Sequence, residues 1–167
     1  FHSELAEAWS VLGYDDNAVK ESRTALELSR NLPDDQRLFV EGGYYEIARD
    51  FGKANTIYRQ LSNSFPDNLE YGLHLARVQP AAEAKVTLAR LRKLPSPDGT
   101  DPRIDLAESD NAYEAGDYKL SEAAAESAAM KAKASGMRGL LGKARYNQGW
   151  TRWGLGDPDG ALKALEE

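Results

Sequence analysis

Apolar and small residues recur along the chain at the spacing of three and four residues that places side chains on one face of an α-helix. The first such segment contains Leu5, Ala6 and Trp9, and after a turn at residues 12–14 the spacing resumes at Ala18. Each segment predicts an amphipathic helix. Because the turn between two segments is short, each pair of segments predicts a helical hairpin.

The same unit recurs throughout the sequence, with a small residue early in the second helix of each hairpin. These small residues are Ala18, Ala54, Ala84, Ser121 and Ala161. They are 36, 30, 37 and 40 residues apart, a period typical of stacked helical repeats. One hairpin cannot bury its apolar face alone, so we expect neighbouring hairpins to stack and share a core.

The pattern therefore predicts an all-α protein, an α-solenoid of about five helical hairpins that forms a single array over residues 1–167. The predicted hairpins cover approximately residues 1–32, 35–66, 68–95, 102–135 and 137–167. The only stretch rich in proline and glycine, residues 95–102, is interpreted as a loop between hairpins rather than a domain boundary.

Composition and charge narrow the classes of function. Hydrophobic residues make up 41% of the chain, which is ordinary for a folded protein, and 21 basic against 27 acidic residues give a net charge of −6. This balance does not indicate nucleic-acid binding. The absence of cysteine excludes disulfides and thiolate metal sites.

No apolar stretch reaches the ~18 residues needed to cross a bilayer, so direct membrane insertion is not predicted. We expect a soluble domain, either cytoplasmic or the extracytoplasmic part of a membrane-anchored regulator. The chain begins at Phe1 and ends within an apparent helix pattern, which suggests a fragment of a larger protein. An exposed terminal hairpin in such a fragment would favour a homodimer.

Three short segments resemble the tetratricopeptide repeat family: Leu5-Ala6 with Trp9, Tyr58 with Pro66-Asp67-Asn68, and Ala115-Gly116-Asp117-Tyr118. The resemblance extends over essentially the whole chain and implies a protein-binding solenoid whose first helices line a concave groove. The sequence departs from the family pattern where a large apolar residue is usual in the first helix. Those positions carry Glu41, Glu108 and Gln148.

Two further segments, residues 65–73 and 101–108, are similar to the C-terminal tetratricopeptide regions of bacterial serine/threonine kinases and winged-helix regulators. This resemblance implies that the chain is the docking or sensing part of a larger bacterial signalling protein. Neither kinase nor winged-helix motifs occur in the sequence itself.

No combination of residues in the sequence predicts catalysis, a metal site or a cofactor. The two histidines, His2 and His74, lack a second ligand at metal-binding spacing. Residues 136–143 do not have the glycine spacing or the terminal Ser/Thr of a phosphate loop, and residues 157–160 are explained by a turn and a helix cap. We therefore predict a non-catalytic domain without cofactors.

A cluster of aromatic residues is the strongest candidate for partner binding. Tyr146, Trp150 and Trp153 fall on one helix face at spacings of four and three, close to two arginines, and aromatic side chains and arginine are frequent in binding hot spots. The alternative that these rings form core remains open. The partner-binding candidates, some of them implied by the family resemblance, are Tyr113, Arg145, Tyr146, Trp150, Arg152, Trp153, Phe39 and Arg77.

The sequence thus predicts a protein–protein interaction module that binds a peptide or a partner domain in a concave groove, within a larger bacterial regulator. The alternative is a regulatory domain that senses a small molecule, in which a ligand among the aromatic residues shifts the packing of the last two hairpins.

Overall fold

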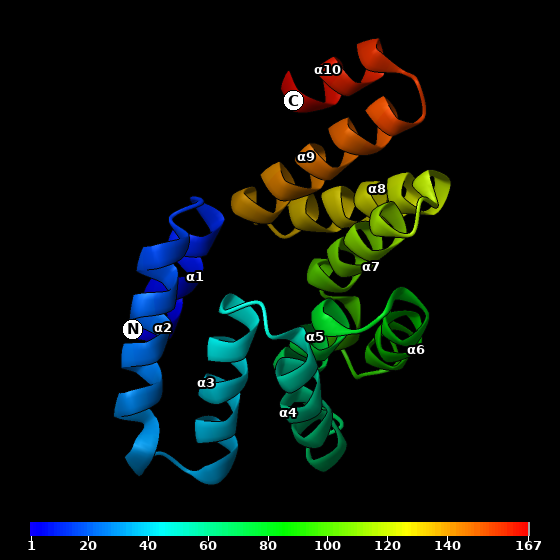
Figure 1. Ribbon diagram of the computed structural model, residues 1–167. Helices are drawn as coiled ribbons and strands as arrows, with labels where there is room; N and C mark the ends of the chain where they lie inside the picture. The colour runs from blue at the N-terminus through cyan, green and yellow to red at the C-terminus, as the bar shows by residue number, and fades with distance from the viewer. Residues whose placement is uncertain (167) are drawn as a thin grey trace. The chain divides into compact units, whose positions relative to one another are not determined.

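The computed structural model describes residues 1–166, and its helices succeed one another in pairs (Figure 1). The first five are α1 (His2–Val11), α2 (Asp15–Leu28), α3 (Asp34–Ile47), α4 (Phe51–Ser64) and α5 (Leu69–Val78). The others are α6 (Ala81–Leu91), α7 (Pro102–Glu114), α8 (Tyr118–Ala134), α9 (Arg138–Gly154) and α10 (Pro158–Glu166). The described residues contain no strand, and the predicted all-α fold of helical hairpins is confirmed. Glu167, the end of the last predicted hairpin, lies outside the described residues.

The turns inside the hairpins use a shared local chemistry. Gly13, Gly116 and Gly156 follow first helices and have φ values of +79°, +76° and +80°, a conformation that glycine adopts without steric cost. In the second hairpin the corresponding position is Arg49, with φ +60°. A side chain in this left-handed region is uncommon, and such strain persists where the surroundings or the function demand it.

The chain consists of two compact units, and the first comprises residues 1–79, with α1 to α5. Its core contains Tyr58, Leu61 and Leu75, against which the partly buried Leu38 and Phe39 pack. Burying a side chain of this size stabilises the fold by roughly 1.5 to 3 kcal/mol. The core joins α3, α4 and α5, and therefore fixes the elements that carry the candidate site.

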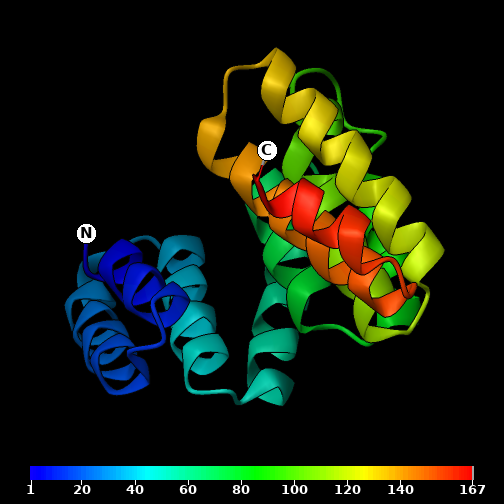
Figure 2. The same cartoon turned by 90° about the horizontal axis from the view of Figure 1, so that it is seen from above.

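The second unit begins at Pro80 and contains α6 to α10. The alanine-rich helix α8 packs against both α7 and α9, as Figure 2 shows, and most of its alanines are buried. Ala128 and Ala129 share a core cluster with Leu106 of α7 and Ala144 of α9. Small side chains let these three helices approach closely.

A buried polar network also joins these three helices. The Ser121 hydroxyl donates to the Ser109 carbonyl at 3.0 Å and lies 2.8 Å from the Thr151 hydroxyl. The Asn147 amide of α9 donates to Asp110 of α7 at 2.7 Å. The inward face of α9 is thus polar, and it leaves the helix's large aromatic residues on the opposite face.

Candidate functional site

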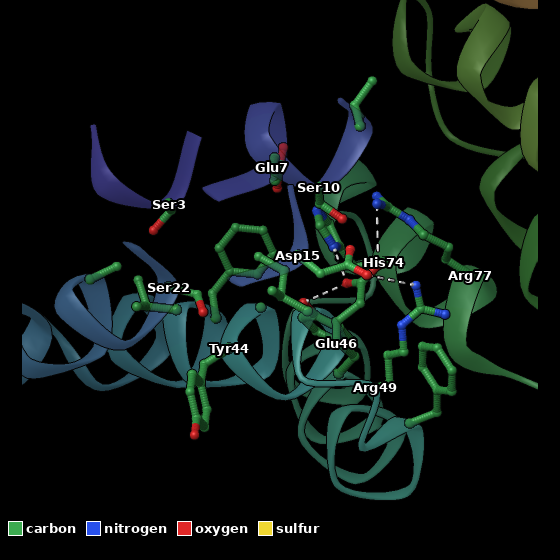
Figure 3. A pocket seen from close by; sticks show the side chains of 18 residues that line it. Ser3, Glu7, Ser10, Asp15, Ser22, Tyr44, Glu46, Arg49, His74 and Arg77 are labelled. Carbon is green, nitrogen blue, oxygen red and sulfur yellow. Dashed lines mark hydrogen bonds and ion pairs between the residues drawn. The ribbon is translucent and has the colours of Figure 1, made fainter. Parts of the chain in front are cut away.

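A pocket of ≈ 350 Å³ lies within the first unit, lined mainly by the first helices of the pairs, α1, α3 and α5 (Figure 3). Phe39, Val40 and Ile47 of α3 supply apolar lining, and Phe51 of α4 adds a half-exposed ring. Pockets of this volume are in the range that accepts a small ligand or a large side chain. The exposed surface of the lining is mainly apolar, so its charged groups decide what the pocket selects. These are three acidic residues, Glu7 and Asp15 among them, and two arginines.

The carboxylate of Glu46 organises the polar side of the pocket. Its Oε2 accepts hydrogen bonds from the Tyr58 hydroxyl at 2.9 Å and from His74 Nδ1 at 3.0 Å. Its Oε1 lies 3.2 Å from Nη1 of Arg77. Three donors from α4 and α5 therefore converge on one acidic side chain of α3, which is only 13% exposed (Figure 3).

This environment shifts the pKa of both Glu46 and Tyr58. Burial raises the pKa of Glu46, but the hydrogen bond from His74 and the positive charge of Arg77 outweigh it, so the net pKa is lowered. Burial first, and then the Glu46 charge, raise the pKa of Tyr58. Glu46 is therefore the anion and Tyr58 the neutral donor, the combination that the observed hydrogen bond requires.

The lowered pKa of Glu46 predicts a specific loss of stability in acid. Because the folded-state pKa lies below the ordinary value of 4.5, the stabilisation is complete above that value and is lost as the pH falls through the folded pKa. We expect Glu46→Gln to be less stable than wild type by about 1 to 3 kcal/mol at pH 7, and the gap to shrink towards pH 3. Urea unfolding at both pH values measures it.

Glu27→Gln is the matched control, since it removes an exposed carboxylate from the same unit outside the pocket. We expect this variant to have the same free energy of unfolding as the wild type at both pH values. A gap between wild type and Glu46→Gln that stays constant or widens in acid would show that the Glu46 charge does not stabilise the fold.

Arg77 and Arg49 place two guanidinium groups at the pocket. Arg77 is 57% exposed, and its ion pair with Glu46 is the one polar contact that its side chain makes within residues 1–166. Arg49, the strained turn residue, lies 3.7 Å from Asp15 of α2, and both side chains are exposed. The Glu46 carboxylate thus holds Arg77 in place while leaving most of its donors open to a ligand.

The structure brings two of the candidates predicted from sequence, Phe39 and Arg77, to this pocket. Phe39 packs edge-on against His74, with ring centroids 4.9 Å apart, and so couples the apolar wall to the Glu46 group. Sequence reasoning had not singled out Glu46, Tyr58 or His74 as a group. One available signal was the spacing of Phe39, Gly42 and Glu46, which places all three on one face of α3.

The other aromatic candidates lie on the surface of the second unit. Tyr146, Trp150 and Trp153 of α9 are 55%, 47% and 65% exposed, and Tyr113 of α7 is 37% exposed. The rings of Tyr146 and Trp150 meet edge-on, with centroids 6.1 Å apart. The alternative that these rings form the core therefore does not describe this structure.

The two arginines beside the aromatic residues are directed elsewhere. Nη1 of Arg145 donates to the buried Gln148 side chain at 2.7 Å. Nε of Arg152 donates to Glu122 of α8 at 2.8 Å, and its Nη1 donates to the Gly160 carbonyl. The Arg152 contacts thus join α9 to α8 and α10, whereas the bond between Arg145 and Gln148 lies within α9.

No group of three or more His, Cys, Asp or Glu side chains in residues 1–166 is arranged to hold a metal ion. No helix in that part of the chain is long and apolar enough to cross a membrane.

Comparisons with known proteins bear on the fold. No family model matches the sequence, and a search of curated proteins found no match. A solved structure titled "MamA MSR-1 C2" is similar to this chain with a TM-score of 0.56, over 99% of this chain and 91% of that one, at 15% sequence identity. MamA contains tetratricopeptide repeats. The chain therefore has a helical fold of the tetratricopeptide type.

Proposed function

We propose that this chain is a protein-interaction module and that the pocket of the first unit binds a peptide segment of the partner. The observation that carries the proposal is the arrangement at Arg77, a half-exposed guanidinium held by the largely buried Glu46 at the edge of a mainly apolar pocket. Guanidinium groups bind carboxylates through charge-assisted hydrogen bonds. The preferred segment therefore combines an apolar side chain with a neighbouring Asp or Glu.

Selection of random dodecapeptides against the whole chain tests this proposal. We expect a family of selected peptides in which an acidic residue lies beside a bulky apolar one. For these peptides Arg77→Gln should weaken binding about tenfold or more, because a hydrogen bond between charged groups contributes ~1.5 to 3 kcal/mol. Isothermal titration calorimetry with the synthetic peptides measures the dissociation constants.

Lys20→Gln provides the control, since Lys20 is an exposed cation of α2 that does not line the pocket. It removes the same charge from the same unit and should leave binding unchanged. The proposal fails if no selected peptide family depends on Arg77, or if Lys20→Gln weakens binding as much as Arg77→Gln does.

A sensor for a small organic carboxylate is the second candidate, favoured by the volume of the pocket, ≈ 350 Å³. It differs from the first in the size of the ligand. A series of short carboxylic acids that raises the melting temperature of wild type, but not of Arg77→Gln, would favour the sensor. Binding that requires a longer peptide would favour the interaction module.

The wider context of the module is also a proposal. The two segments similar to bacterial kinases and winged-helix regulators support a place in a larger bacterial signalling protein. The exposed side chains of Leu162 and Leu165 on α10 support a homodimer formed through the last hairpin. Light scattering of the chain and of Leu162→Glu distinguishes a dimer from a monomer.

A further inference from the structure

One exposed face of α9 carries a continuous row of two glycines and three aromatic residues. Gly139, Gly142, Tyr146, Trp150 and Trp153 are spaced by three, four, four and three residues, which aligns them along one side of the helix. All five are exposed. We call this row the α9 stripe.

The two glycines of the α9 stripe have no internal reason to be glycine. A Cβ atom on Gly139 or Gly142 would meet nothing within 4 Å, and neither has a positive φ. Elsewhere in α9, a Cβ on Gly149 would lie 2.8 Å from Leu165, and one on Gly154 would lie 3.0 Å from the Tyr118 ring. Glycine disfavours a helix, so its use at Gly142 points to a close approach from outside.

The segment that contains the α9 stripe is basic, in contrast to the whole protein. Residues 127–156 contain six basic and no acidic side chains, whereas the chain carries a net charge of −6. Three of the six basic side chains form ion pairs with carboxylates of α7 and α8. The side chain of Arg138 is exposed and has no partner among the described residues, and Lys143 reaches Asp110 only at 3.4 Å in a half-exposed pair. A basic surface with exposed apolar rings is complementary to an acidic segment that also has an apolar face.

We propose that the α9 stripe is the docking surface for an acidic amphipathic helix of a partner protein. The helix backbone approaches closely over Gly139 and Gly142, because the distance between packed helices is set by the side chains at their contact. Its apolar face covers Tyr146, Trp150 and Trp153, and its carboxylates meet Arg138 and Lys143. This adds a second surface to the proposed interaction function.

The ring geometry favours a helix over single-stranded nucleic acid. Bases bind to aromatic side chains by stacking on open ring faces. The rings of Tyr146 and Trp150 are instead inclined at 67° and meet edge-on, so they do not form parallel platforms for successive bases. Edge-on rings provide an uneven apolar surface of the kind into which the side chains of a helix pack.

The test uses the whole chain carrying Trp9→Phe, so that tryptophan emission reports on Trp150 and Trp153 alone. The probe is a synthetic helical peptide of eighteen residues with leucine on one face and glutamate on the other, and the matched peptide has lysine in place of glutamate. We expect the acidic peptide to shift the emission to shorter wavelength and to bind at least tenfold more tightly than the lysine peptide.

Gly142→Leu should weaken the binding of the acidic peptide at least tenfold. It should not lower the melting temperature of the protein, because a Cβ atom at Gly142 meets nothing within 4 Å. Arg77→Gln, in the pocket of the first unit, should leave this binding unchanged. If Arg77→Gln abolishes binding and Gly142→Leu does not, the peptide occupies the pocket, which overturns this inference and supports the proposed function. Equal binding of the two peptides, or tighter binding of an oligo-dT strand, also overturns it.

Discussion

Replacing Gly42 by alanine is expected to destabilise the first unit by about 2 kcal/mol, the middle of the range for overpacking a core. A Cβ atom at Gly42 would lie 2.6 Å from Cε1 and 2.9 Å from Cζ of Tyr58. The ring has no room to yield, because Tyr58 is fully buried, packs against Phe39 and His74, and donates its hydroxyl hydrogen to Glu46. The added methyl group must displace the ring or the helix.

Gly43→Ala is the matched control, one position further along α3. Its Cβ atom would meet only the Tyr58 hydroxyl oxygen, at the ordinary contact distance of 3.8 Å. Since alanine is favoured over glycine in a helix by ~1 kcal/mol, this variant should be neutral or slightly more stable than wild type. Urea unfolding of both variants measures the difference. Equal stabilities would mean that α3 and α4 are not closely packed at Gly42.

The same substitution should also affect the candidate site. Displacing the Tyr58 ring moves one of the three donors to Glu46, and the carboxylate in turn holds Arg77. Gly42→Ala should therefore weaken the binding of peptides that depend on Arg77, although Gly42 itself does not line the pocket. Gly43 lines the pocket, but Gly43→Ala leaves the Tyr58 ring in place. This variant therefore separates blockage of the pocket from displacement of the Tyr58 ring.

The helical hairpins could be predicted from sequence because each depends on local information. Apolar spacing within ten to fourteen residues defines a helix such as α4, and a glycine such as Gly116 followed by a capping residue such as Asp117 defines the turn. These signals do not require knowledge of how the hairpins pack. The all-α fold was therefore accessible before the structure.

The Glu46 group could not be predicted in the same way. Glu46 lies 12 residues from Tyr58 and 28 from His74, so their contacts depend on how α3, α4 and α5 pack together. An isolated glutamate in an amphipathic helix is typical of a solvated face. Only the packed core shows that this carboxylate is largely buried, accepts two hydrogen bonds and pairs with Arg77.

The position of the aromatic residues of α9 was left open by the sequence for a related reason. Aromatic rows on helices most often pack inward. In α9 the inward positions are taken by Asn147, Gln148 and Thr151, which are buried. Ser109 of α7 is a polar partner for Asn147, and Ser121 of α8 is one for Thr151. Because of these partners, the helix turns its polar side inward and its rings outward.

Replacing Asp105 by alanine is expected to destabilise the second unit by about 3 kcal/mol, the low end of the range for breaking a buried ion pair. The side chain of Asp105 is only 5% exposed. It accepts hydrogen bonds from Arg92, just after α6, at 3.0 Å and from Lys131 of α8 at 2.6 Å. The low end applies because Arg92 keeps its bonds to Glu108 and Lys131 is partly exposed to water.

Asp110→Ala tests whether burial or mere pairing determines the effect. Asp110 is on the same helix and also faces a lysine, Lys143 at 3.4 Å, but both side chains are about half exposed. Exposed ion pairs contribute at most about 1 kcal/mol. The hydrogen bond from Asn147 contributes ~1.5 kcal/mol, the low end of the range for a bond to a charged group, because Asp110 is half exposed. We therefore expect a lower melting temperature for Asp105→Ala than for Asp110→Ala. The reverse order would mean that Asp105 is less essential than the Asn147–Asp110 contact for joining the helices of the second unit.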